Sequence, residues 1–190
     1  MARLYRGRSN MTLFQNKYRV ETTRLAYWDY ASAGWYFVTI CTRNREHFFG
    51  EVVSGEMRLS AVGEIARQFW ADIPAHFEHA RVDEYVVMPN HVHGIVVIVE
   101  TRAVETRDRA SLPNQFGPLK RGSLQSIVNA YKGSVTRWCR ENDRGYFAWQ
   151  PRFHDHVVRD EIDLGRIRQY ICDNPAQWES DRENEAGLWM

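Results

Sequence analysis

The stretch 85–99 is an almost unbroken apolar run, and it carries two histidines, His91 and His93, one residue apart. A run this rich in Val and Ile predicts a strand that is buried on both faces. Because successive side chains of a strand alternate between its faces, both histidines point to the same face. Two neighbouring imidazoles can hold one metal ion, although a His on an apolar strand is as often an ordinary core residue. Pro89 lies just before the pair, and since proline cannot donate to a sheet ladder, the strand must bulge or begin there.

The chain of 190 residues is long enough for one domain with a sizeable core, and its 44% hydrophobic and 26% charged residues are typical of a soluble globular protein. The formal net charge of +1 gives no overall indication of nucleic-acid binding. Positive charge gathers at the start, where residues 1–24 hold six arginine and lysine side chains against one glutamate. Such an arm either follows phosphates or is a solvated tail. We therefore divide the chain into a basic arm at 1–26, one domain at 27–178 and an acidic tail at 179–190.

The three cysteines, Cys41, Cys139 and Cys172, are an odd number at wide spacings and form no CxxC pattern. This argues against a disulfide framework or a structural zinc site and predicts a reducing compartment. No apolar stretch reaches the roughly 18 residues that are needed to span a bilayer, and the arginine-rich start lacks the apolar region of a signal peptide. We expect a cytoplasmic protein with no membrane partner.

Local patterns predict further elements on both sides of the apolar run. β-Branched and aromatic runs bounded by turn residues indicate strands, and capping residues followed by apolar residues at helical spacing indicate helices. The sequence predicts strands at 35–42, 47–52 (continuing the first after a turn), 57–59 and 152–158, and helices from Ser60 to Pro74, from Ser123 to about Asn142 and from Asp160 to Pro175. Residues 101–122, rich in Arg, Pro and Gly with few large apolar side chains, predict a long flexible insertion loop that either contacts phosphates or is solvated.

The last predicted helix carries two polar groups at the edge of its apolar face. At about 100° per residue, Leu164, Ile167 and Ile171 form the core stripe, and Tyr170 and Asn174 lie about 70° to one side of it. Taken alone, the pair is more simply an amphipathic tyrosine and an asparagine near the helix end.

Together, the block Met88-Pro89-Asn90-His91-Val92-His93 and the block Tyr170-Ile171-Cys172-Asp173-Asn174-Pro175 resemble the HUH single-tyrosine transposases, insertion-sequence transposases that act on single-stranded DNA. Within that family the chain is most similar to the REP-associated tyrosine transposases. The resemblance covers roughly 27–178, including the segment 36–45 and the pair Lys132-Gly133. It implies an α+β fold, a ferredoxin-like or RRM-like antiparallel sheet with helices packed on one face, whereas periodicity alone leaves several α+β folds open.

The resemblance also implies a catalytic site. His91, His93 and Asn174 would hold a divalent metal ion, Mg²⁺ or Mn²⁺, and Tyr170 would be the nucleophile that nicks and rejoins DNA at hairpin sites through a 5′-phosphotyrosine. These residue types suit the chemistry, because a metal ion that neutralises a phosphate oxygen lowers the barrier and a tyrosine ester conserves the phosphodiester energy for rejoining. Two histidines and an amide also leave ligand positions open, unlike the closed sites of structural zinc.

Rival residues leave parts of this site open. Tyr131 on the second helix is the competing nucleophile, although its apolar neighbours predict that it is packed in the core. His154 and His156 form a second His-x-His in the last strand. They either make a second metal site, or join His91 and His93 in a four-histidine cluster, or leave His156 to face DNA.

The partners implied by the resemblance are single-stranded and hairpin DNA, and both a monomer and a homodimer occur within the family. Six side chains are candidates for contacting DNA, each of which is otherwise a solvated surface group. They are Arg43, Arg45, Lys132, Arg137, Arg152 and His156. Two other functions remain open: a catalytically silent nucleic-acid-binding protein on the same fold, and a histidine-rich metal-dependent hydrolase.

Overall fold

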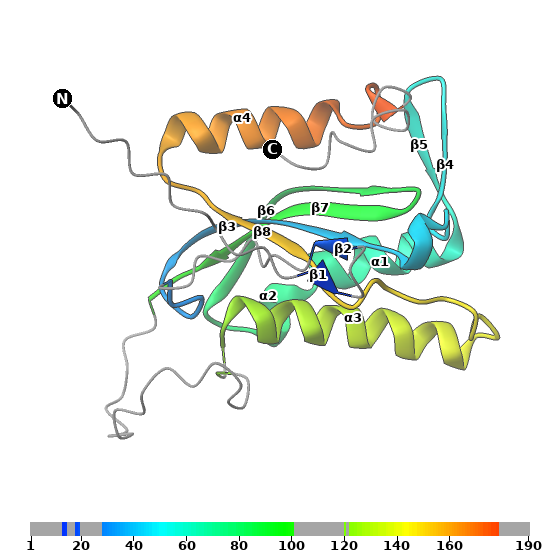
Figure 1. Ribbon diagram of the computed structural model, residues 1–190, viewed down its shortest axis with the longest axis horizontal. Helices are drawn as coiled ribbons and strands as arrows, with labels where there is room; N and C mark the ends of the chain where they lie inside the picture. Colours follow the sequence, from blue (N-terminus) through cyan, green and yellow to red (C-terminus); the bar gives the residue numbers. More distant parts are fainter. Residues whose placement is uncertain (1–12, 15–17, 20–27, 101–119, 121, 179–190) are drawn as a thin grey trace.

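A four-stranded antiparallel sheet forms the centre of the computed structural model, which describes residues 13–14, 18–19, 28–100, 120 and 122–178 (Figure 1). Its strands, in spatial order, are β6 (Ala80–Met88), β7 (His91–Ile98), β3 (Gly34–Cys41) and β8 (His154–Val157). In chain order a helix follows β3 and another follows β7, which is the arrangement of a ferredoxin-like fold. The predicted α+β class and antiparallel sheet are therefore confirmed.

The helices and the short strands lie around this sheet. They are α1 (Ala61–Ala71), α2 (Ile73–His76), α3 (Leu124–Glu141), α4 (Glu161–Asp173), the 3₁₀ turn η1 (Arg43–Arg45), the hairpin of β4 (Gly50–Val53) and β5 (Glu56–Leu59), and the pair β1 (Leu13–Phe14) and β2 (Tyr18–Arg19). The predicted caps Ser60, Ser123 and Asp160 each accept a hydrogen bond from the backbone N–H three residues on. None of the described helices is both long enough and apolar enough to cross a membrane.

The helices cover both faces of the sheet, so the prediction that all of them pack on one face is wrong. In Figure 1, α4 lies on one side of the sheet and α1, α2 and α3 lie on the other. The cause is visible in β3, where Tyr36 and Val38 belong to the core under α1 and α3, while Trp35 and Phe37 pack with the apolar residues of α4. Since both faces of this strand are apolar, each face needs a covering layer.

The apolar run that was expected to be one strand folds as two. β6 ends at Met88, Pro89 and Asn90 form the turn, and β7 begins at His91, which pairs with Met88. Proline marks the turn because it has no N–H to donate to a ladder. The expected continuation of β3 through 47–52 is also wrong, since β4 pairs only with β5 in a separate hairpin.

Three sequence predictions fall on other parts of the chain. The basic arm at 1–26 and the acidic tail at 179–190 lie outside the described residues, apart from the two short strands β1 and β2. The insertion loop at 101–122 likewise lies outside them, except for Lys120 and Gly122.

A glycine in β7 makes room for the largest side chain of the core. Trp70 on α1 is fully buried, and its indole lies against Gly94 so closely that a Cβ at this position would collide with the ring and lie 2.9 Å from the Cβ of Tyr85. The other side of the indole meets Tyr131 edge to face, with ring centroids 5.2 Å apart. Trp70 is thus held on two sides and cannot move away without disturbing α3.

The substitution Gly94→Ala should therefore lower the free energy of unfolding by about 1–3 kcal/mol, the usual cost of overpacking a core. Urea denaturation followed by circular dichroism measures it. Gly145→Ala is the control, because a Cβ at that loop position meets nothing within 4 Å. Equal midpoints for the two variants would show that the core yields to the extra methyl group.

An ion pair fastens α4 to the edge of the sheet. Arg168 donates two hydrogen bonds to the carboxylate of Asp83 on β6, both 2.8 Å long, and its guanidinium lies 5.5 Å from the ring centre of Trp35. The arginine holds the pKa of Asp83 below its usual range, against a smaller opposing effect of burial. The register of α4 on the sheet thus depends on a charged contact as well as on apolar packing.

We expect the Asp83→Asn variant to be less stable than the wild type at pH 7. Because the pKa of the carboxyl is lowered in the folded state, its stabilisation is present above the pKa of the unfolded chain and is lost as the pH falls through the folded value. The difference between the urea midpoints of the two proteins should thus begin to shrink below about pH 4 and vanish only below the lowered pKa of the folded state. Glu51→Gln removes an exposed carboxylate without a described ion pair and should leave the pH dependence unchanged. A pH-independent difference for Asp83→Asn would assign the loss to packing.

Candidate active site

Four side chains from two elements meet between the sheet and α4. His91 and His93 on β7 point to the α4 face, with ring centroids 4.3 Å apart and exposures of 4% and 1%. The Tyr170 hydroxyl lies 3.2 Å from Nε2 of His93. Asn174, fully buried at the end of α4, lies near enough to His91 to act on its pKa, where it opposes the larger effect of burial. The structure thus brings together the four residues that the two motifs predicted.

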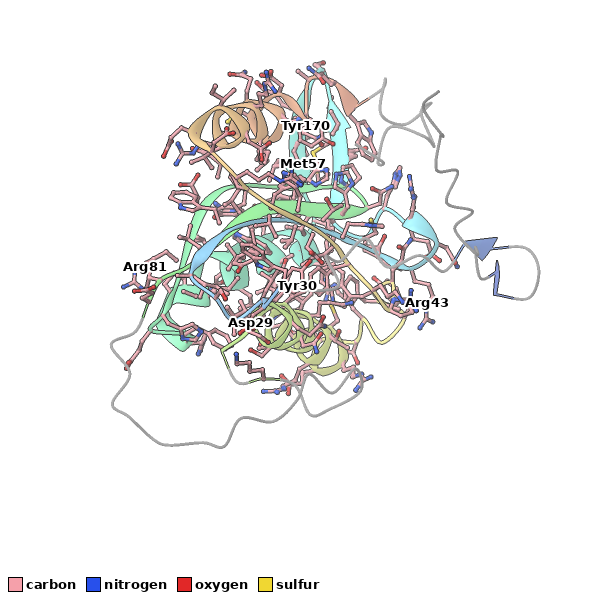
Figure 2. The ribbon with its side chains drawn as sticks, turned by 60° about the vertical axis from the view of Figure 1, so that its left-hand side comes forward. Asp29, Tyr30, Arg43, Met57, Arg81 and Tyr170 are labelled. Atoms are coloured by element: carbon pink, nitrogen blue, oxygen red, sulfur yellow. The ribbon has the colours of Figure 1, made fainter. Side chains whose placement is uncertain are left out.

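The direction of the two motifs follows from their elements. Because β7 alternates its side chains, the histidines share one face, and because Tyr170 and Asn174 are one helical turn apart, they share one side of α4. Figure 2 shows Tyr170 on the α4 side of the sheet and Tyr30 on the α3 side. All four groups come from a single chain.

Hydrogen bonds fix how His91 presents its ring nitrogens. The Asn90 amide donates from Nδ2 to the carbonyl of Arg45 at 3.2 Å, so its Oδ1 faces His91 Nδ1 at 2.8 Å. An amide oxygen can only accept, and Nδ1 of His91 must therefore carry the proton. Its Nε2 keeps a bare lone pair that faces the site.

The ring of His93 is also oriented by a hydrogen bond at Nδ1. Its Nδ1 lies 2.8 Å from the hydroxyl of Thr39, the residue directly opposite on β3. Both rings are thus anchored through Nδ1, and Nε2 is the atom that each presents to the site. Partners of this kind orient histidines that bind metals.

Burial keeps both histidines neutral. It lowers the pKa of His91 to about 3, with a further contribution from the nearby positive charge of Arg45. Burial also lowers the pKa of His93 well below its usual value, and His91 adds to this effect. The neutral imidazole is the form that can bind a metal ion.

The residues present fit a divalent cation. Nε2 of His91 is buried and has no hydrogen-bond partner within the described part of the chain. A buried nitrogen without a partner lowers the stability of the fold unless a ligand binds to it. Two imidazole nitrogens and an amide are ligands that Mn²⁺ and related ions accept, whereas Mg²⁺ prefers oxygen. His91, His93 and Asn174 would hold such an ion.

The second His-x-His does not build a metal centre. Over the described ranges, no group of three or more His, Cys, Asp or Glu side chains is placed to hold a metal ion. His156 instead lies 2.8 Å from Asp163 at the start of α4, and His154 is half-buried opposite Thr39. The hypotheses of a second site and of a four-histidine cluster are therefore wrong.

Tyr131 is packed, as its neighbours predicted. Its hydroxyl donates to the carbonyl of Ala66 at 3.1 Å, and burial raises its pKa. It belongs to the core under α1 and α3, on the face of the sheet opposite the histidines. A tyrosine in this position cannot serve as the nucleophile of the site.

Four of the six predicted DNA-contacting residues lie in two places, on opposite sides of the sheet. Arg43 and Arg45 lie in η1, directly after β3, where Arg45 acts on the pKa of His91. The backbone of Arg45 has a φ of 54°, a left-handed conformation that is unfavourable for arginine and that places its carbonyl against Asn90. Lys132 and Arg137 lie on α3, on the other side of the sheet.

The two remaining candidates are less directly placed. Arg152 is exposed in the loop before β8. His156, also exposed, lies within hydrogen-bond distance of the Asp163 carboxylate. Lys132 also links α3 to the loop before β8, since its ammonium donates to the carbonyls of Gln150 and Pro151 at 2.7 and 3.3 Å.

Three residues of the site were missed from the sequence. Thr39 and Asn90 hold the histidines, and Trp178, 7% exposed, packs its ring 6.0 Å from that of His91. Asn90 directly precedes His91, so its contact with that ring could have been expected from the sequence. Thr39 is identified only by the register of β3 on β7, and Trp178 only by the course of the chain after α4.

Comparison with known proteins bears on the family and the fold of the chain. No protein-family model matches the chain. A Haemophilus influenzae protein described as uncharacterized is 38% identical over 165 residues, which cover 84% of this chain and 89% of that protein. The structure of a REP-associated tyrosine transposase bound to a REP hairpin is similar with a TM-score of 0.54 at 20% identity, over 82% of this chain and 74% of that chain. The chain therefore belongs to one family with the Haemophilus influenzae protein, and it has the fold of a REP-associated tyrosine transposase.

Proposed function

We propose that the protein is a transposase-like enzyme that nicks and rejoins single-stranded DNA at hairpin sites through a 5′-phosphotyrosine on Tyr170. The observation that carries this proposal is the position of the Tyr170 hydroxyl, 3.2 Å from Nε2 of His93 and beside the buried pair His91 and Asn174. The shared fold with a transposase described in complex with a REP hairpin supports a nucleic-acid substrate.

The chain's own residues account for most of the reaction. Tyr170 attacks the phosphorus, an Oη–P bond forms, and the P–O3′ bond breaks to leave a 3′-hydroxyl. The proton that the phenol loses is matched by the proton that the 3′ oxygen gains, so the exchange consumes no phosphodiester bond. Rejoining is the same step in reverse with another 3′-hydroxyl. This conservation suits strand transfer better than hydrolysis.

A divalent ion, Mg²⁺ or Mn²⁺, when bound by His91, His93 and Asn174, supplies a Lewis acid that neutralises a phosphate oxygen. Asn90 keeps His91 in the tautomer that this requires, and Thr39 orients the ring of His93. Arg45 adds a positive charge beside the pair, which favours an anionic substrate. Since one chain provides all four groups, the proposed reaction needs no second copy.

Incubation with a labelled single-stranded hairpin oligonucleotide and Mn²⁺ should give a covalent protein–DNA adduct that withstands denaturing electrophoresis. Tyr170→Phe should abolish the adduct, because the variant lacks the attacking oxygen. The control is Tyr131→Phe, which removes a hydroxyl on the opposite face and should keep the adduct.

Other outcomes of this assay point to the two alternative functions. Binding of the wild type without any adduct would make the protein a catalytically silent nucleic-acid-binding protein. Free cleavage products without an adduct would make it a metal-dependent hydrolase.

The metal site can be tested without any reaction. Asn90→Ala removes the acceptor that fixes the tautomer of His91, and it should weaken Mn²⁺ binding about 10- to 100-fold in isothermal titration calorimetry. His91→Ala should abolish binding. The control His76→Ala removes an exposed imidazole of α2 and should leave the affinity unchanged. Wild-type affinity in Asn90→Ala would contradict the proposed role of this hydrogen bond.

A further inference from the structure

An open groove runs along α3, on the side of the sheet away from the candidate active site. Its volume is about 410 Å³, and it is lined by Lys132, Gly133, Thr136, Arg137, Arg140 and Trp149. Three of these six residues are cationic and none is acidic. The groove therefore favours an anionic occupant.

Two of its cations have no partner among the residues that the structure describes. Arg137 and Arg140 are exposed, and neither forms a hydrogen bond or ion pair with any described residue. Among the other exposed basic side chains, Arg67 pairs with Glu64 and Lys120 pairs with Asp29, whereas Arg58 and Arg166 also have no described partner. The two guanidinium groups on α3 are thus free to contact an external group.

Gly133 adds a second observation. It lies inside α3, where glycine is unfavourable compared with alanine, and a Cβ at this position would meet nothing within 4 Å. Packing within the molecule does not require the glycine. Its open surface instead allows another backbone to approach the helix closely.

These residues share one side of the helix. Gly133, Arg137 and Arg140 are spaced at i, i+4 and i+7, so they lie along about 10 Å of a single face. The floor of the groove is rigid, because Trp149 donates from Nε1 to the carbonyl of Lys132 at 3.1 Å and the Lys132 ammonium is held by the following loop.

The same loop joins the groove to the active-site end of the sheet. Trp149 bridges to Thr42, and the N–H of Arg43 donates to the carbonyl of Ala148 at 2.8 Å. Arg43 begins η1, whose Arg45 lies near His91. A ligand that follows positive charge can therefore extend from α3 past η1 toward the histidines.

We propose that this groove binds the sugar-phosphate backbone of a DNA duplex, with Arg137 and Arg140 on phosphates and the backbone passing over Gly133. Proteins that hold unpaired strands offer exposed aromatic rings on which bases stack, but the single aromatic residue of this groove, Trp149, is buried in the core. Contacts to phosphate alone suit a double helix. The inference rests on the proposed function in one respect, that the duplex is the stem adjoining the strand cut at Tyr170.

Binding can be measured by fluorescence anisotropy in the Tyr170→Phe background, which removes covalent capture. The probes are a blunt duplex of arbitrary sequence, since phosphate contacts do not read sequence, and one of its strands alone. The double substitution Arg137→Gln/Arg140→Gln should weaken duplex binding at least 10-fold and lower the slope of log K against log salt by about two, one for each lost phosphate contact. Arg67→Gln, which removes a paired charge from α1, should change neither value.

Gly133→Ala separates binding from folding. It should raise the melting temperature by a few degrees, as expected for a glycine replaced inside a helix, and yet weaken duplex binding several-fold. Gly165→Ala in α4, where a Cβ also meets nothing within 4 Å, should raise the melting temperature without changing binding.

Three results would overturn the proposal: equal losses for Arg67→Gln and the double variant, equal losses for duplex and unpaired strand, or wild-type duplex binding by Gly133→Ala. These binding results do not depend on whether Tyr170 reacts with DNA. A wild-type protein that forms no adduct but binds the duplex through the groove would contradict the proposed reaction and still support the groove as a duplex-binding site. An adduct on Tyr170 with unaffected duplex binding in the groove variants would do the reverse.

Discussion

The antiparallel register of β7 on β3 is the constraint on which the candidate site depends. It sets His93 opposite Thr39 and His91 opposite Cys41, and it turns both imidazoles away from the core that contains Trp70. A slip of one residue would move every side chain of β7 to the other face and exchange the histidines for Val92 and Gly94. The close fit of Gly94 against Trp70 opposes such a slip, since only glycine fits there. Core packing on one face thereby fixes the chemistry of the other.

The second requirement is the position of α4, which closes the site by bringing Tyr170 and Asn174 over the histidines. Its apolar side packs on Ile95 of β7, and its ion pair with Asp83 reaches the edge strand β6. Side chains that are far apart in the chain thus form one group only after the sheet is complete. The opposite layer has a different character, since α3 exposes Arg137 and Arg140 to solvent while its buried side is mainly apolar.

Much of this was accessible from the sequence, for physical reasons that differ between residues. The caps Ser60, Ser123 and Asp160 are local signals, and local patterns located α1, α3 and α4 correctly. The turn at Pro89 was only half recognised, because a buried hairpin and a single buried strand give the same apolar run. That α4 covers the opposite face was not accessible from its own periodicity, which reports that a helix has an apolar side but not which sheet face it meets. Thr39 and Trp178 escaped for the same reason, since their contacts with the histidines exist only in three dimensions.

The electrostatics of the site are costly for the fold, which bears on what the site does. Burying the Nε2 atom of His91 without a hydrogen-bond partner among the described residues costs about 1–3 kcal/mol, and apolar side chains of similar size in place of the two histidines would avoid this cost. The surrounding residues do not relieve it. Asn90 and Thr39 are bonded to the Nδ1 atoms and leave the lone pair of His91 directed into the site. A centre that must receive a cation and a phosphate needs neutral, oriented and incompletely bonded nitrogens, and the Nδ1 contacts of His91 and His93 provide that orientation. The unfavourable burial is thus the strongest physical reason to regard His91 and His93 as a functional pair and not as part of the core.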